Sequence, residues 1–207
     1  MTPSTRIFLV ALCLSGCGWL HAQPSAPVVL ARDGQALCDV VTVVGAGERT
    51  VRAAAELAGY LEQISGAAFR VVQGDGVNGI VLGTATDWPG MAGDLFDPQD
   101  LLRREEYRIR SHAEGLWLVG ATELAVEHAM WDLLDRLGYR HYFPGNLWEV
   151  VPASETLQVN LDVFAKPSFL DRAIGKDGNW LRWQRDNWER WQRHNRVTSG
   201  LTMRTSH

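Results

Sequence analysis

Two amphipathic helices, separated by short runs of strand-forming residues, are the feature of the sequence that most constrains the fold of this chain. Residues 50–65 place apolar side chains three and four positions apart, with charged residues on the other side. Gly66 follows, suited to the left-handed position that ends a helix. Residues 123–137 repeat the pattern, with Thr122 as the expected N-cap and Gly138 after the last apolar residue. Each helix therefore has one face to bury against another layer.

That layer is predicted to be a sheet. The chain contains short runs rich in β-branched and aromatic residues, bounded by glycine, asparagine or proline. The order of elements fits an α+β fold in which a mixed or antiparallel sheet carries the two helices on one face. The runs expected to form strands are residues 28–31, 40–44, 68–72, 80–84, 106–111, 116–120, 139–143 and 157–161.

Composition narrows the class of protein. The 207 residues are 46% hydrophobic and 21% charged, with a formal net charge of −4. A general nucleic-acid binder needs an excess of cationic side chains, so no nucleic-acid partner is expected. No apolar run reaches the ~18 residues of a membrane-spanning helix. A (β/α)₈ barrel takes about 250 residues and does not fit beside anything else on this chain.

The first residues have the pattern of an export signal. Residues 1–22 contain one charge, Arg6, then an apolar run and a Leu-His-Ala sequence typical of a cleavage site. Residues 14–17, Leu-Ser-Gly-Cys, also match the bacterial lipobox, in which Cys17 is lipidated. We therefore expect an exported product, periplasmic or extracellular, with a membrane-anchored lipoprotein as the alternative. Cys38 alone stays in the fold, which predicts no disulfide framework.

The amino-acid composition of the chain changes after residue 165. Residues 172–207 contain seven arginines, and tryptophans at spacings of three, five and three predict a helix over about 179–194. Such a helix suits a membrane surface or a nucleic-acid groove. The interpretation that we favour is that residues 166–207 begin a further packed domain or form a tail.

Motifs for catalysis are missing from the sequence. It has no His-Glu-x-x-His, Gly-x-Ser-x-Gly or Walker motif. Gly45-Ala46-Gly47 is interpreted as a strand–helix turn and not as a cofactor-binding loop. The sequence therefore predicts no cofactor, no metal ion and no catalytic residue. Glu127 and His128 lie in the middle of the second helix without a third ligand nearby, so His128 is interpreted as a flank histidine next to a solvated carboxylate, in preference to a metal site. His141 and His194, which have aromatic or polar neighbours, are the better candidates for contacts with a sugar, although packing remains an alternative.

An ordered series of segments is similar to a known accessory domain. The first helix and the sheet of that domain resemble residues 53–66, 79–83, 105–109 and 116–120. The end of its second helix resembles residues 133–140. Two shorter pieces complete the series, Phe143-Pro144-Gly145 and Val151-Pro152. The domain precedes the catalytic barrel in bacterial alpha-glucuronidases, β-hexosaminidases and related glycoside hydrolases. The resemblance covers about residues 26–172 and assigns residues 26–165 to this domain.

The resemblance implies a domain that braces a sugar-cleaving barrel and is not catalytic on its own. The catalytic acids of these families lie on the barrel, so the carbohydrate substrate, of xylan type, is expected to bind through a downstream barrel that residues 166–207 would begin. The alternative is a stand-alone carbohydrate-binding lipoprotein of the cell envelope. The length of the native product distinguishes the two.

Two residues are candidates for substrate binding. Residues 167–172, Pro-Ser-Phe-Leu-Asp-Arg, resemble the Pro-x-Phe-x-x-Arg that opens the barrel of hexosaminidases, where the arginine binds sugar hydroxyls. This implies a substrate contact for Arg172, although Ala173 stands where the family has glycine; a structural arginine is the alternative. Trp148 is a candidate for stacking on a sugar ring or for a place in the core.

Overall fold

The computed structural model describes residues 27–92, 96–97, 99–169, 171–172, 174 and 185–198. The expected signal peptide at residues 1–22 and the lipidation of Cys17 lie outside these residues. No helix among them is long and apolar enough to cross a membrane.

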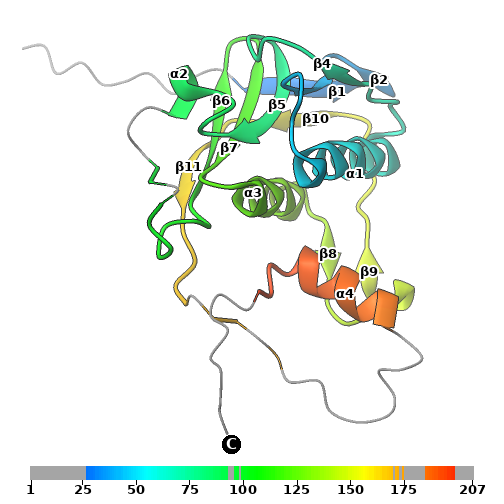
Figure 1. Cartoon of the computed structure of the whole chain (residues 1–207). Coiled ribbons are helices and arrows are strands. Elements are labelled where there is room, and N and C mark those ends of the chain that lie inside the picture. The colour runs from blue at the N-terminus through cyan, green and yellow to red at the C-terminus, as the bar shows by residue number, and fades with distance from the viewer. Residues whose placement is uncertain are drawn as a thin grey trace, which may run out of the picture.

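A six-stranded mixed sheet forms the centre of the fold, in the order β11-β6-β7-β5-β3-β4 (Figure 1). Parallel pairing joins β4, β3, β5 and β7, whereas β6 pairs antiparallel with both β7 and β11. The strands are β3 (Val40–Thr42), β4 (Val71–Gln73), β5 (Gly79–Thr84), β6 (Tyr107–His112), β7 (Gly115–Gly120) and β11 (Asp162–Ala165).

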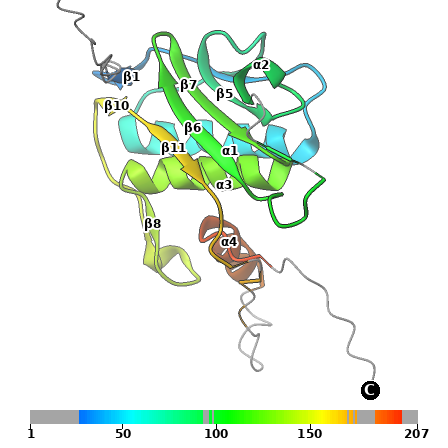
Figure 2. The same cartoon turned by 90° about the vertical axis from the view of Figure 1, so that its left-hand side faces the viewer.

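Two long helices, α1 (Glu48–Ser65) and α3 (Glu123–Arg136), cover one face of this sheet (Figure 2). Their apolar sides and the sheet form one buried cluster. Gly66 ends α1 at φ 73°, and the hydroxyl of Thr122 accepts from the backbone N–H of Ala125 at the start of α3. The sequence-based prediction of an α+β fold with two helices on one face of a mixed sheet is confirmed.

The opposite face carries a smaller cluster of Val41, Val81, Trp88 and Val119, next to the short helix α2 (Pro89–Ala92). A separate sheet has the order β10-β1-β2, so residues from both ends of the domain pair with each other. Its strands are β1 (Val28–Arg32), β2 (Gln35–Ala36) and β10 (Leu157–Val159).

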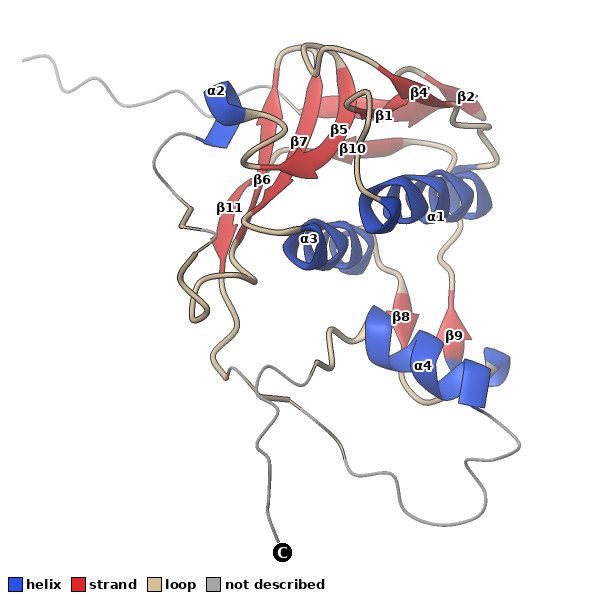
Figure 3. Cartoon of the chain, in the orientation of Figure 1, coloured by secondary structure: helices blue, strands red, loops and turns tan. Residues whose placement is uncertain are grey.

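A two-stranded hairpin extends beyond the helices (Figure 3). It consists of β8 (Arg140–His141) and β9 (Glu149–Val150), joined through a 3₁₀ turn at Asn146–Trp148. β8 is shorter than the strand expected over residues 139–143, because the chain turns after His141 toward Gly145, which has φ 114°.

The last described helix is α4 (Arg185–His194), which lies beside the β8–β9 hairpin in Figure 1. The helix was expected over about residues 179–194, and the part before residue 185 falls outside the described residues. Residues 185–198 are called the α4 segment below. The described residues contain no closed barrel.

Candidate functional site

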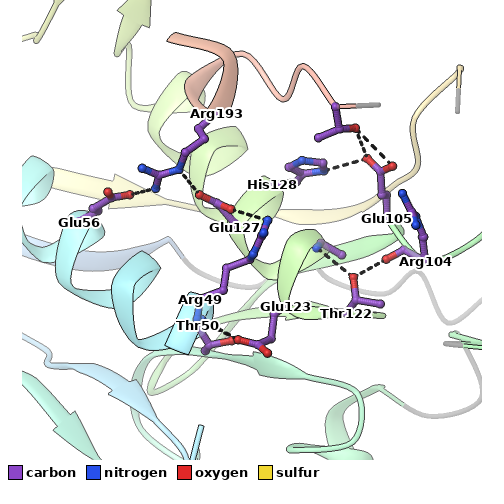
Figure 4. A network of polar contacts seen from close by, with 12 residues as sticks. Arg49, Thr50, Glu56, Arg104, Glu105, Thr122, Glu123, Glu127, His128 and Arg193 are labelled. Atoms are coloured by element: carbon purple, nitrogen blue, oxygen red, sulfur yellow. Dashed lines mark hydrogen bonds and ion pairs between the residues drawn. The ribbon is translucent and has the colours of Figure 1, made fainter. Parts of the chain in front are cut away.

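The α4 segment is bound to the two long helices by arginines. Nε of Arg193 donates to Oε1 of Glu127 on α3 at 2.6 Å, and Nη2 donates to Oε2 of Glu56 on α1 at 2.5 Å (Figure 4). Nη1 of Arg49 donates to the other oxygen of Glu127 at 3.1 Å. One guanidinium therefore joins α4 to both helices at once.

Glu127 and His128 correct the sequence interpretation. The carboxylate of Glu127 was expected to be solvated and His128 to lie on the flank of the helix, yet the two residues are only 2% and 3% exposed. The reason is that their side of α3 is covered by the α4 segment, about 60 residues later in the chain. Burying a carboxylate is costly unless it is paired and hydrogen-bonded, and Arg49 and Arg193 provide these contacts for Glu127.

Arg172 is held by the protein at three nitrogens. Nη2 contacts Oε2 of Glu105 and donates to Oγ1 of Thr198 at 2.7 Å. Nε donates to the carbonyl of Arg196 at 2.9 Å, and Nη1 donates to the carbonyl of Phe169 at 2.5 Å. In this arrangement Arg172 connects the α4 segment to Glu105, a residue just before β6 that is 2% exposed.

His128 lies against the same carboxylate, with Nδ1 3.4 Å from Oε2 of Glu105. Burial, followed by the charges of Arg172, Arg196 and Arg49, lowers the pKa of His128 to about 3. The carboxylate of Glu105 is itself ion-paired with Arg172. His128 is therefore uncharged at neutral pH.

These groups line a pocket of about 300 Å³ between the domain and the α4 segment. Its two carboxylates, Glu105 and Asp132, are each paired with arginine; Asp132 lies 3.2 Å from Nε of Arg136 and 3.4 Å from Nη1 of Arg196. Glycoside cleavage needs one carboxyl group that can donate a proton and a second that can act as nucleophile or base. Carboxylates held by arginine suit the binding of polar groups better than proton transfer.

Trp148 lies elsewhere, in the 3₁₀ turn of the β8–β9 hairpin, and is not among the residues that line this pocket. Its side chain is 53% exposed and meets Phe143 edge-on, with ring centroids 5.9 Å apart. Tyr142 and Leu147 are 65% and 97% exposed. These four residues are called the aromatic tip. The two predicted sugar contacts thus do not share one pocket.

His141 and His194 do come together, although they lie on different elements. Their Nδ1 atoms are 2.9 Å apart, and the two side chains are buried, at 4% and 5% exposure. A sugar in solution does not reach side chains this deeply buried. Sequence reasoning named both residues separately, and no spacing signal joined them.

Comparisons with known proteins identify the fold. No protein-family model matches the chain, and no curated protein is significantly similar to it in sequence. Among solved structures, it is similar to a family GH115 4-O-methyl-alpha-glucuronidase with specificity for decorated arabinogalactans, at 19% identity and a TM-score of 0.51. The match covers 68% of this chain and 18% of that chain.

Two further similar structures are family GH20 enzymes. An exo-beta-N-acetylglucosaminidase from Vibrio harveyi matches at 15% identity and a TM-score of 0.41, over 72% of this chain and 19% of that chain. A beta-N-acetylhexosaminidase from Streptomyces coelicolor A3(2) matches at 20% identity and a TM-score of 0.38, over 66% of this chain and 24% of that chain. The chain therefore spans less than a quarter of each of these three structures. It has a fold like that of one part of a glycoside hydrolase.

Proposed function

We propose that this chain is the accessory part of an exported, alpha-glucuronidase-like glycoside hydrolase that takes part in the breakdown of xylan-type polysaccharide. In this proposal the chain itself does not cleave the sugar. It braces a catalytic domain that follows residues 26–165, and residues 166–207 form the connection.

One observation carries the proposal: most of the described fold corresponds to less than a fifth of a much longer glucuronidase. The match is to one part of an enzyme, which fits a supporting domain. Function resides in particular sites and not in the fold, so the shared fold does not by itself make this part catalytic. The pocket chemistry agrees, since both of its carboxylates are bound by arginine.

The contacts of the α4 segment support the bracing role. Arg190, Arg193 and Arg196 form ion pairs with side chains of the domain, namely Glu149, Glu56, Glu127, Asp132 and Asp135. An ion-pair network that spans several elements restrains orientation better than an isolated surface pair does. A segment bound in this way would hold whatever follows it in a fixed position.

The mass of the native protein tests the proposal. An antibody raised against residues 50–165 would be used to blot the source cells. We expect a band far above 23.1 kDa, the mass of this chain. The full-length product should then hydrolyse aryl-glucuronides, whereas the 207-residue chain should not. A band at or below 23.1 kDa, or turnover by the chain alone, would contradict the proposal.

The aromatic tip favours a second function, that of a stand-alone carbohydrate-binding protein of the cell envelope. Exposed aromatic rings present flat apolar faces, and a group of them on a hairpin tip is unusual on a surface without a partner. Trp148 and Tyr142 would stack on sugar rings.

Affinity electrophoresis in gels that contain xylan or arabinogalactan tests this second function. Wild-type protein should be retarded, and Trp148→Ala should migrate as it does in a gel without polysaccharide. Leu37→Ala is the matched control, because Leu37 is also 53% exposed but lies outside the tip. Equal mobility of wild type and Trp148→Ala in every gel would exclude sugar stacking by this residue.

A further inference from the structure

We infer that His141, Glu149 and His194 form a binding site for a divalent transition metal ion of the Zn²⁺ type, which joins α4 to the β8–β9 hairpin. The inference does not depend on the proposed function. Sequence analysis found no metal-binding motif and predicted no metal site; the two histidines are 53 residues apart in the chain.

The distances suit one ion. One ligand atom from each of the three residues lies within 4.8 Å of the other two. The Nδ1 atoms of His141 and His194 are 2.9 Å apart, and Oε1 of Glu149 lies 4.0 Å from Nδ1 of His194. Zinc–nitrogen bonds are about 2.0–2.1 Å long, so nitrogens at this separation subtend roughly 90° at the ion. Spreading the two imidazoles by about half an ångström gives the tetrahedral angle.

Hydrogen bonding alone does not satisfy the cluster. Each ring nitrogen of histidine carries either one proton or one lone pair in the ring plane, so it can donate or accept only one well-aligned hydrogen bond. Nδ1 of His194 nevertheless lies within hydrogen-bond distance of two atoms, Nδ1 of His141 at 2.9 Å and the hydroxyl of Tyr139 at 2.5 Å. That hydroxyl already has an acceptor, Oε1 of Glu149, at 2.6 Å. A shared cation would use the lone pairs of both imidazoles at once.

The enclosure of the two imidazoles suits metal binding. His141 and His194 are buried, at 4% and 5% exposure. Burial favours the neutral form of a histidine, which is the form that binds metals.

The carboxylate has the orienting contacts that metal ligands commonly have. The hydroxyl of Tyr60 donates to Oε1 of Glu149 at 2.7 Å, and Nη2 of Arg190 donates to Oε2 at 2.8 Å. Although burial raises the pKa of Glu149, hydrogen bonds from Tyr139 and Tyr60 and the charge of Arg190 outweigh it, and the pKa is lowered. Such outer contacts fix the geometry of a ligand. The charge of Arg190 opposes a cation, so we expect weaker binding than at a site with a second carboxylate.

The position of the cluster gives the ion a structural role. His141 is in β8 and Glu149 in β9, whereas His194 is the last residue of α4. The ring of Trp131 on α3 lies against that of His194, tilted by 32° and with centroids 3.8 Å apart. An ion bound there would connect the α4 segment to the β8–β9 hairpin.

Metal titration of the purified chain, without a histidine tag and after treatment with chelator, tests the inference. Co²⁺ should give the visible absorption of a low-coordinate site and saturate at one equivalent, and Zn²⁺ should displace it. Zn²⁺ should also raise the melting temperature. No visible absorption with Co²⁺, together with an unchanged melting temperature in Zn²⁺, would overturn the inference.

Variants assign the ligands. His141→Ala and His194→Ala should lose the Co²⁺ spectrum, whereas His112→Ala, in the β6–β7 hairpin, should keep it. Tyr139→Phe should weaken binding by about 10-fold to 100-fold, because it removes only an orienting contact. A spectrum that persists in both alanine variants would show that the ligand set is wrong. X-ray absorption of the wild-type zinc complex gives the same answer if a variant fails to fold: two imidazoles and one carboxylate oxygen are expected, and any other set contradicts the inference.

Discussion

Arg193 and Glu127 form an ion pair that joins the α4 segment to the domain. The carboxylate of Glu127 is on α3, its side chain is 3% exposed, and Nε of Arg193 lies 2.6 Å from it. The pair is enclosed because α1 lies on one side, through Glu56, and α4 on the other. Glu127 therefore depends on a residue 66 positions later in the chain.

Removing this arginine should destabilise the protein. Arg193→Met keeps much of the apolar stem and leaves Glu127 with Arg49 as its remaining ion-pair partner. We expect a loss of about 1–3 kcal/mol in the free energy of unfolding, measured by urea denaturation, because a charged acceptor loses a buried hydrogen bond. Arg70→Met is the control, since Arg70 pairs with Asp39 on the surface and is 79% exposed. Equal stability of the two variants would contradict the buried contact.

The buried histidines predict sensitivity to acid. The pKa of His128 falls from 6.5 to about 3 on folding, so the unfolded chain binds a proton that the folded chain excludes between these pH values. The contribution of uncharged His128 to the free energy of unfolding is fully present above pH 6.5, and it is lost as the pH falls toward 3. The slope from this histidine should approach about 1.4 kcal/mol per pH unit.

Urea denaturation at a series of pH values measures this slope. His128→Gln should remove the contribution of one histidine, and His112→Gln, which changes a half-exposed hairpin residue, should leave most of the slope in place. A stability profile that is the same in wild type and His128→Gln between pH 3 and 6.5 would contradict the burial of an uncharged His128.

The contact between Arg172 and Glu105 predicts a linked change in the pKa of His128. Arg172→Gln removes one of the positive charges that lower this pKa and leaves Glu105 free to attract a proton to the imidazole 3.4 Å away. The pKa of His128, followed by NMR, should therefore rise toward 6.5. Arg136→Gln should leave it nearly unchanged, because Arg136 pairs with Asp132. A sugar contact by Arg172 does not by itself predict this shift, so an unchanged pKa would separate the two roles.

Local signals in the sequence predicted the helices well. The expected helices over 50–65 and 123–137 correspond to Glu48–Ser65 and Glu123–Arg136, and both the Thr122 cap and the Gly66 end were predicted. Capping and periodicity are readable because they involve neighbouring residues. The strand order was not predictable in this way, since β5 lies between β3 and β7 through pairings that no short-range pattern contains.

The polar contacts were hidden for a related reason. A carboxylate on a helix flank looks solvated until a distant segment covers it, as the α4 segment covers Glu127. His141 and His194 are adjacent only because the hairpin and α4 meet. Such contacts can be predicted only when the packing of the helices and strands is known, and that packing depends on the whole fold.

Two glycines, Gly79 and Gly59, should respond in opposite ways to alanine. Gly79 begins β5 at φ 94°, and a methyl group there would lie 2.6 Å from the carbonyl oxygen of Asp39. Gly59 is inside α1, and a methyl group there meets no atom within 4 Å. We expect Gly79→Ala to cost at least about 2 kcal/mol, from the left-handed backbone and the clash. Gly59→Ala should stabilise the protein by up to about 1 kcal/mol, since alanine favours the helix. Thermal and urea unfolding of the two variants compares them directly, and a loss of stability in Gly59→Ala would mean that this side of α1 is covered.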